Sequence, residues 1–251
     1  MIKFFRKIRK KLLSESKFSK YLIYALGEIV LVVIGILIAL QVNNLNEQRK
    51  ENNFEVGILK EIRTNLQTDL IEIREDLELM GIINKACLDV RSHLLNLEQP
   101  TDSLSVSAAI LRVTPHFSPI TSGYNLLQNK NVGIIKNDNL RDAILYQYDM
   151  LYPYYKTYED ERGRFHALHS EPQLIEYFSM NYDSNQSLSF RGLFFEISKE
   201  DYQRLRNDSK FLKLLKAIAF ENSATKSRGH RVEKSIIELI NKINTELKQK
   251  H

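Results

Sequence analysis

The chain has 251 residues, 43% of them hydrophobic, a formal net charge of +5 and a single cysteine. One cysteine cannot form an intramolecular disulfide, so a folded domain must be stabilised by its core alone. Subtracting the +7 of residues 1–20 from the formal +5 leaves −2 for residues 21–251. This balance removes the main support for nucleic-acid binding.

The first 20 residues form a basic leader with eight Lys or Arg and one acid, Glu15. Basic segments beside a membrane helix are attracted to anionic lipid headgroups. Apolar residues recur at helical spacing among the basic ones, which predicts an interfacial amphipathic helix over residues 2–13. The side chains expected to contact the lipid bilayer are Lys3, Arg6, Lys7, Arg9, Lys10 and Lys11.

The run of residues 21–42 holds one ionisable side chain, Glu28. As a helix it is about 33 Å long, enough to cross a hydrocarbon core of roughly 30 Å. The alternative is a cleaved signal peptide, but the run is longer than such an apolar core and ends on a poor cleavage site. We therefore predict an uncleaved signal anchor. By the positive-inside rule its leader stays in the cytoplasm and residues 43–251 form a domain on the other side.

Glu28 is the strongest functional signal in the chain. An acid at this depth costs on the order of 2 to 3 kcal/mol, so it is expected to face protein or water, or to be protonated. Ala25, Gly35 and Ala39 share its helical face, and the spacing of Gly35 and Ala39 lets two backbones approach. We expect a helix–helix interface with a second copy or another membrane protein. The alternatives are a neutral acid that reaches the headgroups without a role, and a proton-coupled acid like those in the rod-like subunits of proton-driven motors.

A long amphipathic helix, continuous with the span, is predicted from Leu59 onward. A first row of apolar residues recurs every seven positions, while Asp69 and Asp76 interrupt the second row. These acids favour packing inside a bundle over a two-stranded coiled coil. Pro100 ends the helix. The first row consists of Leu59, Leu66, Ile73, Met80, Cys87 and Leu94.

Residues 98–137 contain three prolines and two glycines and are predicted to connect the long helix to the next one. Only short helices fit in this segment, with Thr121 or Ser122 as a candidate N-cap. The short helices are expected over residues 103–113 and 122–129.

The second half of the chain is predicted to be helical except for one loop, over residues 181–197. A long last helix follows Asp208 as its N-cap and can pack antiparallel to the first. Asn222, Thr225 and Gly229 lie on its inward stripe, where they indicate either a helix break or a small polar cavity; the break is favoured. The fold class is therefore all-α, an extracytoplasmic bundle framed by long first and last helices. Its other helices are expected from Asn137 or Asp138 through Tyr152, over 154–169, from Pro172 to about Met180, and after Ser198.

Six of the twelve tyrosines lie between residues 146 and 158, too many for one helical face. One face is expected to carry Tyr148, Tyr152 and Tyr155, and another Tyr154 and Tyr158. Exposed tyrosines suit a protein or glycan partner, whereas buried ones are ordinary core with the hydroxyl at the edge. The core interpretation is favoured, with these five residues as candidate partner-binding aromatics.

Chemistry-bearing motifs do not assemble in this sequence. His166 and His169 at i and i+3 lack an identifiable third ligand, so no metal site and no cofactor is predicted. Cys87 lies on the buried stripe, where a thiol behaves as a small hydrophobe. Without a nucleophile elbow, phosphate loop or zinc motif, an enzyme is disfavoured.

Three blocks resemble a family of small single-span bacterial envelope proteins with no assigned function. The first block is the leader and span, up to GEIVLVVIGILIALQVNN and the following LNEQRK; the others are TSGYNLLQNKNVGIIKNDNLRDAILYQYD and DYQRLRNDSKFLKLL. The resemblance implies a bacterial inner membrane and a periplasmic domain. It supplies no activity, substrate or catalytic residue.

These observations predict a non-enzymatic, oligomerising scaffold or partner-binding module anchored in the membrane. The partners expected are the anionic bilayer and either a second copy or another membrane protein, with no nucleic acid. One alternative is an energy-transducing subunit that relies on Glu28. Another is a periplasmic ligand sensor, which would need a partner because the 20-residue leader has no room for an output domain.

Overall fold

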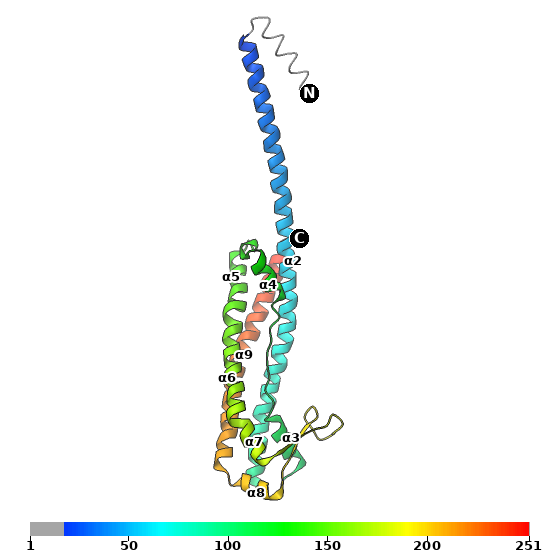
Figure 1. Ribbon diagram of the computed structural model, residues 1–251, viewed down its shortest axis with the longest axis vertical. Coiled ribbons are helices and arrows are strands. Elements are labelled where there is room, and N and C mark those ends of the chain that lie inside the picture. The colour runs from blue at the N-terminus through cyan, green and yellow to red at the C-terminus, as the bar shows by residue number, and fades with distance from the viewer. Residues whose placement is uncertain (1–17, 251) are drawn as a thin grey trace. The chain divides into compact units, whose positions relative to one another are not determined.

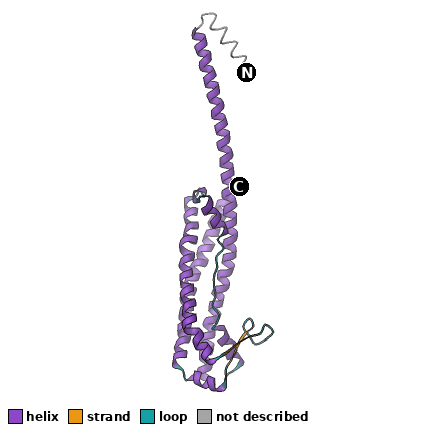
Figure 2. Cartoon of the chain, viewed as in Figure 1, coloured by secondary structure: helices purple, strands orange, loops and turns teal. Residues whose placement is uncertain are grey.

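The computed structural model describes residues 18–250 and is almost entirely helical (Figures 1 and 2). The predicted all-α class is therefore confirmed. The chain divides into two units, the first up to Glu55 and the second from Val56 onward. The predicted amphipathic helix over residues 2–13, with its lipid-contacting Lys and Arg side chains, lies outside the described residues.

Helix α2 (Phe18–Asn96) is continuous from the apolar run into the heptad-patterned segment, as predicted. Within the first unit, its large apolar side chains from Leu22 to Val42 are exposed. An 18-residue window of this helix has a mean hydropathy of 2.5, and none of it is buried. The segment is long and apolar enough to cross a membrane.

In the second unit, α2 packs antiparallel to the last helix, α9 (Ser209–Gln249), as predicted. Residue numbers fall along α9 as they rise along α2 in three side-chain contacts, which are Arg63–Asn244 at 3.2 Å, Arg74–Glu233 at 2.7 Å and Asn84–Ser223 at 3.0 Å. Helix α9 is unbroken, so the predicted break at Asn222–Gly229 is wrong. Gly229 instead allows close packing, because a Cβ there would lie 2.8 Å from Leu77 Cδ2 and 3.1 Å from the Tyr155 hydroxyl.

The remaining helices lie between these two in the chain. Asn137 caps α5 as predicted, by accepting a hydrogen bond from Leu140 N. Helix α4 begins at Ser122 after the predicted cap position Thr121, whose side chain makes no capping hydrogen bond, and Thr101, which was not predicted as a cap, accepts from Leu104 N at the start of α3. Two π-helical segments flank α6, a feature that the sequence pattern did not indicate. The elements are α3 (Asp102–Ile110), α4 (Ser122–Lys130), the 3-10 turn η1 (Val132–Ile134), α5 (Asp138–Leu145), π-helix η2 (Tyr146–Leu151), α6 (Tyr152–Phe165), π-helix η3 (His166–Ser170), α7 (Glu171–Tyr177) and α8 (Lys199–Arg206).

A short β-hairpin replaces part of the loop predicted over residues 181–197. Strands β1 (Ser179–Tyr182) and β2 (Leu193–Glu196) pair antiparallel, with Ser179 opposite Glu196. The strands are short, and Phe195 is fully buried in the core beside α3. Tertiary packing, more than a local alternation pattern, therefore fixes this hairpin.

Two hydrophobic clusters fill the second unit. The first joins the early part of α2 to α5, η2, α6 and the C-terminal half of α9. The second joins the later part of α2 to α3, α7, β2, α8 and the N-terminal half of α9. All six residues of the predicted first apolar row on α2 are buried.

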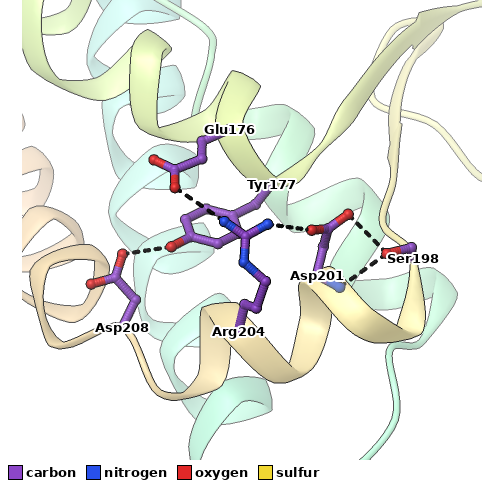
Figure 3. Close-up of polar contacts among 6 residues, drawn as sticks. All are labelled: Glu176, Tyr177, Ser198, Asp201, Arg204 and Asp208. Carbon is purple, nitrogen blue, oxygen red and sulfur yellow. Dashed lines mark hydrogen bonds and ion pairs between the residues drawn. The ribbon is translucent and has the colours of Figure 1, made fainter.

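Polar side chains fix the junctions of α7, α8 and α9 (Figure 3). Ser198 caps α8 by accepting from Asp201 N at 2.9 Å, and Asp208 caps α9 by accepting from Lys210 N at 2.8 Å, both as predicted. The Asp208 carboxylate also accepts from the Tyr177 hydroxyl at 2.9 Å. Arg204 lies over the Tyr177 ring and binds Asp201 and Glu176. This network holds three helix ends together.

Candidate functional site

The most unusual feature of the bundle is an extended segment, residues 113–121, which we call the strap (Figure 2). It follows α3 and leads into α4. Buried backbone N–H groups require hydrogen-bond partners, and in a strand the neighbouring strand supplies them. In the strap, side chains of α2 and α6 supply them instead.

Acidic residues on α2 bind the even-numbered N–H groups of the strap. Ser118 N donates to Glu72 Oε1 at 3.1 Å, and Ile120 N donates to Asp69 Oδ1 at 2.9 Å. His116 N donates to Asp76. These acids are spaced i, i+3 and i+7, so they lie along one side of the helix. The two acids that interrupt the apolar pattern of α2 are thus ligands for the strap backbone.

Helix α6 binds the odd-numbered groups from the other side. Phe117 N donates to Glu159 Oε1 at 3.1 Å, and the Pro115 carbonyl accepts from Arg162 Nη2. This alternation follows from extended backbone geometry, in which successive residues present their polar groups to opposite sides. The strap therefore links α2 to α6 without belonging to a sheet.

Just after the strap, α4 begins close against α2. Gly123 N donates to Asn65 Oδ1 at 2.9 Å, and the Ser122 hydroxyl contacts Glu61 and Asn65. A Cβ at Gly123 would lie 2.8 Å from Ile62 N, a backbone atom. Glycine is the residue that permits this approach.

Arg162 is the cation at the centre of the site, and it is only 5% exposed. Its Nη1 donates to Asn222 Oδ1 at 3.5 Å, and its charge acts on Asp76 and Glu159. Arg162, Ser170 and Asn222 also line a cavity of about 20 Å³, room for one water molecule. Of the three residues for which the sequence left a small polar cavity open, Asn222 lines this cavity, whereas Thr225 and Gly229 do not.

Burial changes the ionisation of the acids that hold the strap. It raises the pKa of Asp69 to about 6, although the Tyr152 hydroxyl, 2.6 Å from its Oδ2, works in the opposite direction. Burial and the nearby Glu72 raise the pKa of Asp76 to about 6. Burial also raises the pKa of Glu159 to about 7, against the hydrogen bond from Phe117 N and the charge of Arg162. Desolvation is thus the dominant effect at all three carboxyls.

The candidate tyrosines fall into two groups. Tyr148, Tyr152 and Tyr155 are buried in the first cluster, so their rings are removed from any partner surface. Tyr154 is 40% exposed and contacts Tyr158 edge-on, with ring centroids 5.0 Å apart. The two predicted faces are therefore present, one in the core and one at the surface.

The residues predicted around Glu28 lie on the apolar part of α2 in the first unit. Gly35 and Ala39 are exposed, and Ala25 and Glu28 are partly so. A Cβ added at Gly35 would meet nothing within 4 Å. The face is thus open to another helix.

A metal site at His166 and His169 finds no support in the geometry. His166 is partly buried, which lowers its pKa, and the His169 ring packs 5.4 Å from Phe165. Across residues 18–250, His, Cys, Asp and Glu form no group of three that could hold a metal ion.

Sequence reasoning missed Glu72, Glu159 and Arg162 as members of this site. Their signal is indirect, because a proline-rich segment lacks N–H groups at Pro115 and Pro119 and cannot form a regular ladder. Such a segment needs side-chain acceptors, and acids on an otherwise apolar stripe are candidates. Glu159 and Arg162 carry no comparable local mark.

Fold and site together define an all-α bundle with an extended, partly buried strap held by side chains of α2 and α6, preceded by an apolar helix of membrane-spanning length. The chain belongs to a family of unknown function, DUF6090, which it matches over residues 28–223. The match includes most of the apolar run, the strap and the first part of α9. No curated protein and no solved structure matches the chain.

Proposed function

We propose that this protein is a single-pass protein of the bacterial inner membrane that works as an oligomeric scaffold or partner-binding module. The leader is in the cytoplasm, residues 21–42 span the bilayer and residues 43–251 are periplasmic. The excess of Lys and Arg before the span supports this orientation. The resemblance of the leader and span to bacterial envelope proteins supports the compartment.

One observation carries the proposal: the uncovered apolar helix contains an acid on the same face as small residues. Glu28, Gly35 and Ala39 lie on one face of α2, and the two small residues let a second helix approach that face. The acids of the strap site support a non-enzymatic function, because each of the four binds a backbone N–H group of the strap. Their role is to hold the fold.

Replacing Glu28 with leucine is expected to weaken self-association by on the order of 1 kcal/mol, about a fivefold lower association constant. The measurement is oxidative dimer yield in native membranes, through a single cysteine at Val42→Cys in a Cys87→Ala background. Gly35→Leu is expected to reduce the dimer yield as well, because the larger side chain keeps the two helix backbones apart. Gly27→Leu is the matched control, since it makes the same change at a position about 100° around the helix from Glu28.

Equal dimer yields for Glu28→Leu, Gly35→Leu and the parent would contradict the proposed interface. Glu28→Gln distinguishes the energy-transducing alternative, because glutamine keeps hydrogen bonding but cannot titrate. A scaffold that carries Glu28→Gln retains both dimer yield and cellular function. A proton-coupled subunit with the same substitution retains the dimer and loses function.

A further inference from the structure

An exposed stripe of large side chains runs along η2 and α6, beside α9. Tyr146 is 51% exposed, Met150 62% and Tyr154 40%, and Tyr158 is partly exposed. They are four residues apart, so they recur about once per helical turn over 12 residues, or about 18 Å. Exposed aromatic and methionine side chains are common anchors in protein interfaces.

Two arginines of α9 place positive charge at one end of the stripe. The Arg228 guanidinium lies 3.6 Å above the Tyr158 ring, and that of Arg231 lies 5.9 Å from the Tyr154 ring centroid. Arg228 Nη1 also donates to Ala224 O at 2.9 Å, which fixes its position. A stacked guanidinium keeps N–H groups at its edge that suit a bidentate carboxylate.

The two arginines contact tyrosine rings and not acids. Within residues 18–250, neither Arg228 nor Arg231 forms an ion pair with an acid, whereas the neighbouring His230 and Lys234 pair with Glu233 and Glu238. The hydrogen bond from Tyr158 and the two guanidinium groups lower the pKa of Tyr154. The Tyr154–Tyr158 end is therefore positive in character.

The opposite end of the stripe is hollowed and of mixed charge. Tyr146 lines a surface hollow of about 300 Å³ together with Asp142, Ser235, Glu238 and Lys242. An apolar side chain fits against the exposed Tyr146 ring there, while an acid is favoured only toward Arg231 and Arg228. The surface is therefore complementary to a ligand that has a row of apolar side chains and carries acids at one end.

We propose that the seam formed by Tyr146, Met150, Tyr154 and Tyr158 with Arg228 and Arg231 is the docking surface for an acidic amphipathic helix of a partner protein. Such a helix would lay its apolar row along the four exposed side chains and place carboxylates on the two arginines. Charge complementarity selects this occupant over a basic or neutral one. The assignment rests on the proposed interaction function and names the surface that performs it.

The test uses the full chain in nanodiscs of zwitterionic lipid and a fluorescent peptide of about 18 residues, with leucines on one helical face and glutamates on the other. Binding is followed by anisotropy, with empty nanodiscs as the blank because amphipathic peptides also bind lipid. The double variant Arg228→Gln/Arg231→Gln is expected to weaken binding about tenfold. Lys213→Gln/Lys216→Gln is the matched control, since it removes the same charge from exposed positions of α9, and it is expected to change affinity less than twofold.

A second variant keeps the test decisive if loss of Arg228 loosens α9 from α6. Tyr146→Ser/Met150→Ser shortens the apolar row without touching the arginine stacks and is also expected to weaken binding. Failure of the glutamate peptide to bind, equal binding by the arginine variant, or equal binding of a lysine-for-glutamate peptide would overturn the proposal. If the parent protein does not bind the peptide and the arginine variant loses self-association, the seam contacts a second copy of the chain. This result would also overturn the proposal. The dimer-yield measurement at Glu28 is independent of these outcomes, so either proposal can fail alone.

Discussion

Replacing Arg162 with methionine is expected to destabilise the bundle by about 3 to 5 kcal/mol, because it leaves buried acids without their cation. Arg162 is 5% exposed and contacts the Pro115 carbonyl and Asn222 while its charge offsets those of Asp76 and Glu159. The measurement is urea unfolding of the full chain in mild detergent, followed by circular dichroism. The strap is expected to lose its attachment to α6 first.

Arg164→Met is the matched control for this variant. Arg164 is on the same helix but exposed, so the same substitution is expected to cost less than about 0.5 kcal/mol. Adding Glu159→Gln to Arg162→Met is expected to recover part of the loss, since it removes one of the orphaned charges. A loss for Arg162→Met no larger than that for Arg164→Met would show that the cation does not hold the strap.

The second large effect is a loss of stability as the pH rises from about 4 to about 7. The pKa values of Asp69 and Asp76 are raised to about 6 and that of Glu159 to about 7, whereas unfolded carboxyls titrate near 4. In this window the folded state holds more protons than the unfolded state, so the free energy of unfolding falls with increasing pH. At about 1.4 kcal/mol per pKa unit, Asp69 and Glu159 together contribute roughly 6 kcal/mol, and the partly exposed Asp76 adds a smaller amount because solvent screens its charge.

Urea unfolding at several pH values measures this slope, and Asp76→Asn tests its source. The variant cannot ionise at this position, so its stability is expected to vary less with pH and to exceed that of the parent above pH 6. The lowered pKa values of Asp208 and Glu233 act only at the acid edge of this window. The lowered pKa of His166 opposes the trend below about pH 6.5, but it is one group against three. Stability that is flat or rises between pH 5 and 7 would contradict the assignment.

The sequence predicts most of the helical architecture because periodicity reports burial directly. The apolar row from Leu59 to Leu94, the caps at Asn137, Ser198 and Asp208 and the long last helix are all present. Helix boundaries agree within a few residues, since capping chemistry is local.

The features that escape prediction depend on residues far apart in the chain. The hairpin of β1 and β2 exists because Phe195 is buried in the core beside α3, and short apolar runs carry no sign of that packing. Gly229 looks like a helix breaker, yet its role is to admit Tyr155 and Leu77 against α9. Local propensity is overridden in both cases by tertiary contact.

The candidate site divides along the same line. Asp69 and Asp76 are visible as anomalies on an apolar stripe, but their partners, strap N–H groups about 40 to 50 residues away, are not. The split of the tyrosines into two faces follows from helical spacing alone. Which face becomes the core depends on the position of α9, whose Arg228 and Arg231 mark the exposed one.

The most direct measurement of the central claim is the side of the membrane on which the bundle lies. In a Cys87→Ala background, single cysteines at Ser14→Cys and Ser187→Cys are exposed to a membrane-impermeant maleimide in intact spheroplasts and again after lysis. Ser187 is exposed in the hairpin loop, and the native Cys87 is buried. We predict that position 187 reacts in intact spheroplasts and position 14 only after lysis. Labelling of position 187 only after lysis, or its recovery in a soluble fragment that begins near residue 42, would contradict a membrane-anchored periplasmic module.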